Sequence, residues 1–218
     1  MGFANRPEAG RRLALELGHL ATAGAIVLGI PRGGVPVAFE IARTLRAPLD
    51  VIITRKIGVP SQPELAMGAI GEDGGVVVNY DVVRTTNVTE EQFDLVEHRE
   101  RTELIRRVRR FREIRTRTSL RGRTAIVVDD GIATGSTARA ACQIARRAGA
   151  ARVVLAVPVA PPLTLVELSE VCDELVCLET PEHFDAVGRW YREFPQTSDQ
   201  EVIDLLRAAH RQGEPDRP

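Results

Sequence analysis

The segment Ala125 to Thr137 reads AIVVDDGIATGST and predicts a buried strand, a tight turn and the start of a helix. The strand ends in two acids, Asp129 and Asp130, and the helix opens after a turn of small residues. Because the first turn of a helix has unpaired N–H groups and the positive end of the helix dipole, it can cradle a phosphate group. Two carboxylates repel phosphate but suit a metal or a polyol. An acid pair this close to a phosphate cradle therefore indicates a ribose that carries a 5-phosphate.

Strands and helices alternate on both sides of this segment. Short apolar runs predict strands over 25–30, 49–54, 124–129, 152–157 and 174–178. Helical patterns lie over 7–20, 35–45, 89–115, 136–148, 163–171 and 199–210. This alternation is typical of the α/β class and predicts a doubly wound parallel sheet with helices on both faces. Ligands of such sheets lie beyond the carboxyl ends of the strands.

The length of 218 residues predicts one domain, over 1–211, followed by a disordered tail at 212–218. One stretch interrupts the alternation, at about 58–86. It contains two prolines, a Gly-rich turn at 71–75 and then three valines. We expect it to form an edge hairpin that acts as a flap over the strand ends.

Composition excludes several classes of protein. A net charge of -1 argues against a nucleic-acid partner, and we expect no membrane partner because the sequence contains no apolar run of spanning length. Charged residues occupy the place of a signal-peptide core, so we expect a cytoplasmic protein. Cys142, Cys172 and Cys177 form no CxxC pair and are predicted to be free thiols.

Two other nucleotide-binding motifs can be tested against the sequence of this segment. A nucleotide-triphosphatase P-loop requires a Lys after its last glycine, and none follows Gly135. A dinucleotide-binding G-x-G-x-x-G is absent after the first predicted strand. An ordinary strand-to-helix loop with an acidic N-cap remains as the simpler alternative.

The string VVDDGIATGST resembles the phosphoribosyl pyrophosphate motif of the type I phosphoribosyltransferases, and the resemblance covers roughly residues 25–178. It implies that Asp129 and Asp130 act in catalysis by holding the 2- and 3-hydroxyls of the ribose. It also implies that a loop of five residues wraps the 5-phosphate, namely Ala133, Thr134, Gly135, Ser136 and Thr137.

Basic residues and glycines at two other predicted strand ends agree with this resemblance. Arg32, Gly33 and Gly34 follow the first strand and resemble the family's pyrophosphate loop, although such a turn is also common in other proteins. Arg55 and Lys56 close the next predicted strand, and we expect both side chains to point at the same anionic ligand. Lys56 is the single lysine among 29 basic residues, a bias that codon usage explains. As a mobile point charge, Lys56 can reach pyrophosphate.

The implied chemistry is substitution at the anomeric carbon of phosphoribosyl pyrophosphate by a nitrogen of a nucleobase, with release of pyrophosphate. Mg²⁺ is the implied cofactor, held by Asp129 and Asp130 directly or through ribose or water. Family members are often oligomers, so we expect a homodimer.

The acceptor base is less well determined. Enzymes for 6-oxopurines typically have an Asp where this chain has Ala133, which argues against hypoxanthine or guanine. The segment at about 180–197 resembles the aromatic hood of those same enzymes, and Phe184, Trp190 and Tyr191 are candidate platforms for the base. The alternative is that these rings only pack the C-terminal segment on the sheet. The expected acceptor is a purine-like base.

Two other functions remain open. The first is a regulatory protein that senses phosphoribosyl pyrophosphate without catalysis, and its best support is the segment 99–123, with eleven arginines in twenty-five residues. That segment predicts a helix with a solvated or subunit-contacting face, or else a polyanion-binding surface. The second is a sugar-phosphate hydrolase that uses Asp129, which lacks an activating partner.

Overall fold

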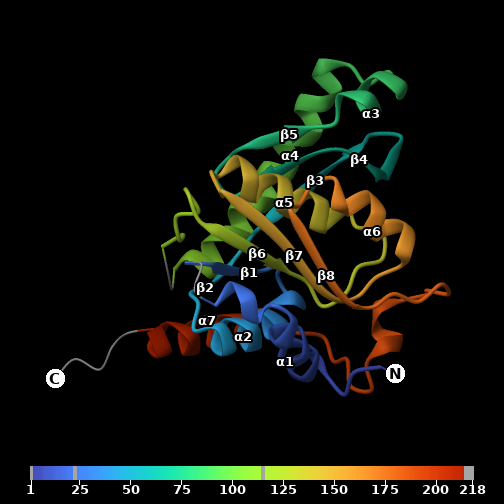
Figure 1. The fold of residues 1–218 in the computed structure, drawn as a ribbon. Helices are drawn as coiled ribbons and strands as arrows, with labels where there is room; N and C mark the ends of the chain where they lie inside the picture. Colours follow the sequence, from blue (N-terminus) through green and yellow to red (C-terminus); the bar gives the residue numbers. More distant parts are fainter. Residues whose placement is uncertain (1, 22–23, 114–115, 214–218) are drawn as a thin grey trace.

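A five-stranded parallel sheet forms the centre of the molecule in the computed structural model, which describes residues 2–21, 24–113 and 116–213 (Figure 1). Its strands, in the spatial order β2-β1-β6-β7-β8, are β2 (Leu49–Val51), β1 (Ile26–Gly29), β6 (Thr124–Val128), β7 (Arg152–Val159) and β8 (Glu174–Glu179). The chain winds from β1 to β2 in one direction and from β6 through β7 to β8 in the other. The sheet is therefore doubly wound, as predicted, and its switch point lies between β1 and β6.

Helices cover both faces of this sheet. One face carries α1 (Arg6–Glu16), α2 (Gly34–Leu45) and α7 (Asp199–Gly213), and the other carries α5 (Ser136–Arg147) and α6 (Pro162–Ser169). Alternate residues along β6 enter different cores: Ile126 packs in the core beneath α2, and Val127 packs in the core beneath α5. Burial on both faces explains why the strands are continuous apolar runs.

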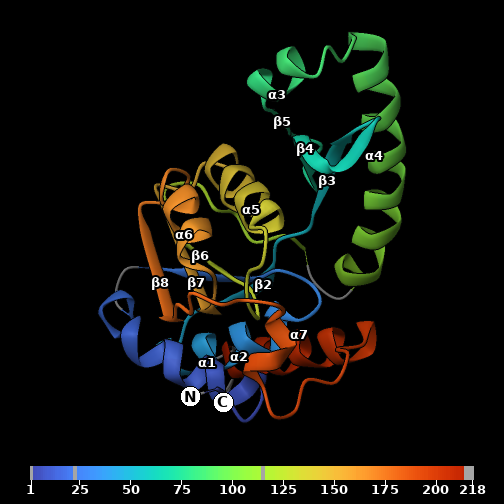
Figure 2. The same ribbon diagram turned by 90° about the vertical axis from the view of Figure 1, so that its right-hand side faces the viewer.

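A second sheet, antiparallel, forms the flap. Its strands are β3 (Thr54–Val59), β4 (Gln62–Gly71) and β5 (Val76–Val78), followed by α3 (Tyr80–Thr85) and the long helix α4 (Glu90–Arg112). Figure 2 shows this sheet and α4 rising together beside the parallel sheet. Met67 of β4 and Phe111 of α4 are fully buried in the same core as Ile126, so the flap is packed onto the central domain.

The boundary of the flap corrects one prediction. We expected a single strand over 49–54, but β2 ends at Val51 and Thr54 already begins β3. Arg55 and Lys56 therefore lie inside the antiparallel sheet and not at the carboxyl end of a parallel strand. The stretch from Val51 to Thr54, where the chain leaves one sheet for the other, contains no Gly, Pro, Asn, Asp or Ser, so the sequence does not mark the change of sheet.

The Arg-rich segment 99–123 is helical only as far as Arg112, in a helix that begins at Glu90. Residues 114–115 lie outside the described residues, and residues 116–123 are not helical, so the helix prediction is wrong for the second part of the segment. The helix begins with a capping box in which Thr89 and Gln92 exchange side-chain hydrogen bonds with each other's backbone N–H groups. Leu104 and Phe111 are buried as the apolar stripe predicts. At the other end, Arg112 lies against Asp50 and Glu72.

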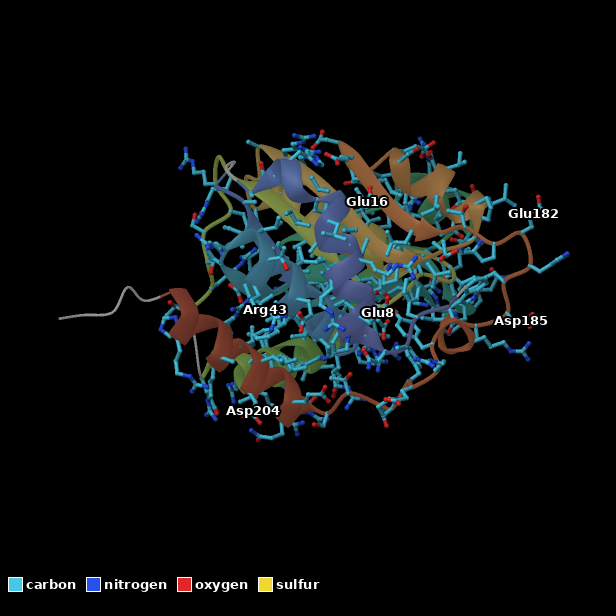
Figure 3. All side chains as sticks on the ribbon, turned by 60° about the horizontal axis from the view of Figure 1, so that its bottom comes forward. Glu8, Glu16, Arg43, Glu182, Asp185 and Asp204 are labelled. Carbon is cyan, nitrogen blue, oxygen red and sulfur yellow. The ribbon has the colours of Figure 1, made fainter. Side chains whose placement is uncertain are left out.

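After β8 the chain forms a loop with a 3₁₀ turn at Val187–Trp190 and then α7; a second 3₁₀ turn, Gly18–Leu20, follows α1. Figure 3 shows α1, α2 and α7 on one face, with Glu8 on α1, Arg43 on α2 and Asp204 on α7. Helix α7 extends to Gly213, so the first two residues of the predicted tail are helical, while 214–218 lie outside the described residues. Within the described part of the chain, no helix combines the length and hydropathy needed to span a membrane.

Candidate functional site

The loops after β1 and β6 meet at the switch point of the sheet. The N–H of Ile30 donates to the carbonyl of Val128 at 2.8 Å, which joins the ends of the two strands. A methyl group on Gly33 would lie 2.0 Å from Oδ2 of Asp130, and one on Gly34 would lie 2.4 Å from the carbonyl oxygen of Val128. The peptide bond between Pro31 and Arg32 is cis. Only glycine, which has no side chain, allows this close approach, so the β1 loop packs directly against Asp129 and Asp130.

Three groups hold Asp130 in place. Arg6 Nε donates to its carboxylate at 2.8 Å, and the Tyr191 hydroxyl donates to its backbone carbonyl at 2.6 Å. Its own N–H donates to Oδ1 of Asp129 at 2.9 Å. Arg6 thus supplies the counter-charge for one of two adjacent carboxylates.

Asp129 has a different environment. Burial, and then the charge of Asp130, raise the pKa of Asp129 well above its usual range. A raised pKa means that the folded state holds this proton more tightly than the unfolded chain. The contribution of Asp129 to stability therefore decreases as the pH rises from its unfolded pKa towards its folded pKa. The two acids are not equivalent, because Asp130 has an arginine partner.

The turn after the acid pair leads directly into α5. Gly135 caps this helix with a φ of 74°, a left-handed conformation that favours glycine. Ala133, Thr134 and Thr137 are exposed, and the Thr134 and Ser136 hydroxyls lie 3.4 Å apart. The five predicted phosphate residues are therefore brought together around the N-terminus of α5, where unpaired N–H groups favour an anion.

A cleft of about 1050 Å³ lies between the flap, α4 and this turn. Its lining includes Pro31, Arg55, Lys56, Gln92, Arg107 and Thr137. The cleft thus brings together the β1 loop, the flap and the predicted phosphate cradle, which are far apart in the sequence.

The model of the phosphoribosyl transferase domain matches residues 9–191 of this chain. The chain belongs to the phosphoribosyltransferase family. The predicted family and the type I fold are thereby confirmed, since the match includes both the acid pair and the parallel sheet.

Two similar proteins illustrate the range of the family. Rv0571c of Mycobacterium tuberculosis H37Rv, which carries the name "putative phosphoribosyl transferase", is 56% identical over 209 residues. That match covers 96% of this chain and 47% of the relative, so this chain spans about half the length of that relative. The crystal structure of TT1426 from Thermus thermophilus superposes with a TM-score of 0.89 at 40% identity, covering 94% of this chain and 98% of that one.

In this member of the phosphoribosyltransferase family, Arg55 and Lys56 have carboxylate partners. Arg55 donates two hydrogen bonds, of 2.8 and 2.5 Å, to Oε2 of Glu100 on α4. Lys56 Nζ lies 3.1 Å from the carboxylate of Glu64, whose side chain is fully exposed. Both side chains line the cleft, but they do not point at one common ligand as expected. They are consecutive residues of a strand, so their side chains leave opposite faces, and each binds a different acid.

The predicted base platforms divide into two groups. Tyr191 is only 7% exposed, and its ring packs against Phe3 and stacks on Phe194. The expectation that Tyr191 offers a free face to a base is therefore wrong. Phe184 and Trp190 are partly buried against the same aromatic cluster, and neither lines the cleft. The packing alternative holds for Tyr191, and the platform role of the other two stays a prediction.

Arg6 is a site residue that the sequence patterns did not predict. Its side chain is 9% exposed, donates to the carbonyl of Pro195 at 2.7 Å and lies 3.8 Å over the ring of Phe194. Arg6 therefore joins the acid pair to the hood segment. The one local signal was its place at the first position of α1, where a basic residue opposes the helix dipole.

In the part of the chain that the structure describes, neither the cysteines nor the acids form a complete metal site. Cys142, Cys172 and Cys177 are free thiols, and burial raises the pKa of Cys177 to about 11. Among the described residues there is no group of three or more His, Cys, Asp or Glu side chains arranged to hold a metal ion. A divalent ion at Asp129 and Asp130 would need most of its ligands from a bound substrate or from water.

Proposed function

We propose that this chain transfers the 5-phosphoribosyl group from phosphoribosyl pyrophosphate to a ring nitrogen of a nucleobase and releases pyrophosphate. The observation that carries the proposal is the placement of Asp129, Asp130 and the N-terminus of α5 opposite the glycine loop of β1. Adjacent carboxylates fit the two hydroxyls of a ribose, and the helix N-terminus fits its 5-phosphate.

The β1 loop and the flap would bind the leaving group. Arg32 and the backbone N–H of Gly33 follow β1 beside Asp130 and are the donors that this loop would offer, since the N–H of Gly34 already donates to the carbonyl of Ile30 at 3.1 Å. Lys56 lines the cleft on the flap, and its partner Glu64 is fully exposed, so pyrophosphate can replace that carboxylate at little cost. Arg55 takes a different role in the proposal: it fixes β3 to α4 through Glu100.

Mg²⁺ fits this arrangement when most of its ligands come from the substrate. Mg²⁺ prefers an octahedron of oxygens with one or two carboxylates and several phosphate or water ligands, and Asp129 and Asp130 supply the carboxylates. When bound, the ion would neutralise charge on the departing pyrophosphate. The protein's residues orient the ribose and keep water away from the anomeric carbon, with the flap as the cover.

The acceptor is a purine-like base in this proposal. The cleft beside Thr137 has room for a heterocycle, and Phe184 and Trp190 are candidates to stack on it once the hood segment moves. A sensor of phosphoribosyl pyrophosphate is the second candidate. It is favoured by one observation, which is that Arg55 and Lys56 are both already paired with carboxylates.

One assay separates these two functions. The full chain is incubated with phosphoribosyl pyrophosphate, Mg²⁺ and each of a panel of purine and pyrimidine bases, and nucleotide and pyrophosphate are measured by mass spectrometry and phosphate release. We expect one nucleotide product with a purine-like base, and none when ribose 5-phosphate replaces the activated sugar. Tight binding of the activated sugar without product from any base would support the sensor instead.

Asp130→Asn is expected to weaken binding of ribose 5-phosphate about tenfold or more, because a charged acceptor for a sugar hydroxyl is lost. Isothermal titration calorimetry measures this affinity directly. Asp204→Asn is the matched control, since Asp204 is exposed on α7 and pairs with Arg207 of the same helix (Figure 3). An Asp130→Asn protein with native affinity would remove Asp130 from the ribose site.

A further inference from the structure

The hood segment is fastened to the first residues of the chain (Figure 1). Phe3 pairs with it in both directions: its N–H donates to the carbonyl of Trp190 at 2.6 Å, and its carbonyl accepts from the N–H of Arg192 at 2.9 Å. The next carbonyl, that of Ala4, accepts from the N–H of Glu193 at 3.0 Å. Residues 3–6, which we call the strap, therefore run beside residues 190–193 of the hood as a short parallel pair.

Arg6, the last residue of the strap, connects this pair to the acid pair. Its Nε donates to Oδ2 of Asp130 at 2.8 Å, and its Nη1 donates to the carbonyl of Pro195 at 2.7 Å. The same guanidinium lies 3.8 Å over the ring of Phe194. Because the donors of a guanidinium are held in one rigid plane, a single Arg side chain can bridge two acceptors in a defined geometry. Arg6 thus fixes the carboxylate of Asp130 relative to the end of the hood.

Two further hood residues contact the turn that carries the acid pair. The Tyr191 hydroxyl donates to the carbonyl of Asp130 at 2.6 Å, and its ring stacks on Phe194. A methyl group on Gly131 would lie 2.5 Å from Cγ1 of Val187, so the backbone of the turn packs directly against the hood. The hood from residue 187 to residue 195 and the acid pair are therefore one packed unit, in which Arg6 is the charged link.

We propose that Arg6 is a positioning residue that couples the ribose site to the hood. This inference rests on the proposed function, in which Asp130 holds a hydroxyl of the ribose. A ribose hydroxyl that donates to the Asp130 carboxylate immobilises it, and with it Arg6 and the part of the hood that Arg6 binds. Because linkage between two sites is reciprocal, a hood held by Arg6 in turn favours the sugar-bound form. Sugar binding and the order of the acceptor side of the site then increase together.

Hydrogen–deuterium exchange of the full chain tests the strap without any ligand. The amides of Arg192 and Glu193 report on it, because both donate to carbonyls of the strap. Arg6→Met keeps a long side chain but loses both hydrogen bonds, so we expect these amides to exchange about tenfold faster or more. Arg11→Met is the matched control, since Arg11 is exposed on the same helix and lies 3.9 Å from Glu40; it should leave these rates unchanged.

Ribose 5-phosphate then tests the coupling. At saturation, checked by calorimetry, it should slow these two amides about fivefold or more in the native chain and change the fluorescence of Trp190, the single tryptophan. In Arg6→Met both responses should be lost although the sugar still binds. Arg6→Lys, which keeps a charge beside Asp130 but lacks the fork, should recover part of them, and it serves for the same comparison if Arg6→Met does not fold or bind. A purely structural Arg6 would change the rates without ligand and leave the response to the sugar intact.

These outcomes separate the coupling from the proposed function. Slowed exchange in the native chain without nucleotide from any base would contradict the transferase and support the coupling. Calorimetric binding of ribose 5-phosphate that changes neither the exchange nor the fluorescence would overturn the coupling and leave the ribose site in place. Ligand-free rates in Arg6→Met that equal the native rates, or a full response to the sugar in that variant, would also overturn it.

Discussion

Gly33→Ala is expected to reduce kcat/KM for phosphoribosyl pyrophosphate about 100-fold, because displacement of a catalytic group by about 1 Å has effects of this size. The added methyl group would lie 2.0 Å from Oδ2 and 2.5 Å from Cγ of Asp130, so either the β1 loop or the carboxylate must move. Asp130 has little freedom to do so, since Arg6 and Tyr191 both hold it. The substitution should therefore displace the acid pair and the β1 loop together, and so weaken binding of the activated sugar.

The cause of this effect is steric and not conformational. Gly33 has a φ of -63°, which any residue adopts, so alanine introduces no backbone strain there. Gly18→Ala is the matched control, because a methyl group at Gly18 meets nothing within 4 Å. Steady-state kinetics and calorimetry with the activated sugar, together with thermal unfolding, distinguish a damaged site from an unfolded chain. Native affinity in a folded Gly33→Ala protein would contradict the proposed site.

Arg112→Leu is expected to lower the free energy of unfolding by about 3–5 kcal/mol, the usual cost of breaking a buried ion pair. Arg112 donates to Asp50 at 2.7 Å and to the two oxygens of Glu72 at 2.7 and 2.6 Å. Asp50 is only 1% exposed, so its charge would be left without a counter-charge. Burial opposes the charge of Arg112, but the hydrogen bond and charge of Glu72, with Asp50, raise its pKa, so this side chain stays protonated.

This ion cluster joins the end of α4 to the edge strand β2 and to the turn that follows β4 of the flap. Denaturant unfolding measures the loss, and Arg109→Leu on the same helix is the control for helix propensity, since Arg109 is exposed. Adding Asp50→Asn to Arg112→Leu should restore part of the stability, because the unpaired charge of Asp50 is then removed, whereas Glu72 keeps Arg117 at 3.5 Å. If Arg112→Leu unfolds like the control, the cluster does not hold the flap to the sheet.

The acid pair shows which placements follow from the sequence alone. Asp129, Asp130 and the residues from Ala133 to Thr137 are adjacent in the chain, and one strand, one turn and one helix start place them all. Their geometry depends on local rules, namely strand burial, the conformation of Gly135 and the exposed first turn of α5. Local rules do not predict the role of Arg6, because Arg6 is 124 residues away from Asp130 in the chain and contacts it only once α1 packs on the sheet.

Arg55 and Lys56 show the opposite case. The apolar run before them predicts a parallel strand, and the end of such a strand predicts that both side chains face one anionic ligand. The chain instead passes from the parallel to the antiparallel sheet at residues 52–53, where the sequence contains no turn residue. Their actual partners, Glu100 and Glu64, depend on how α4 and the flap pack. Tyr191 was misassigned for a similar reason, since its neighbour Phe3 comes from the other end of the chain.

Patterns along the chain thus specify the α/β class, the doubly wound order and the residues of one continuous motif, because each depends on periodicity or on neighbours within a few positions. Tertiary packing decides which charges meet. It brings Arg6 to Asp130 and Arg112 to Asp50. These contacts join residues that are far apart in the sequence, so helical or strand periodicity does not predict them. Which opposite charges meet in a partly buried site is decided only when the helices pack on the sheet.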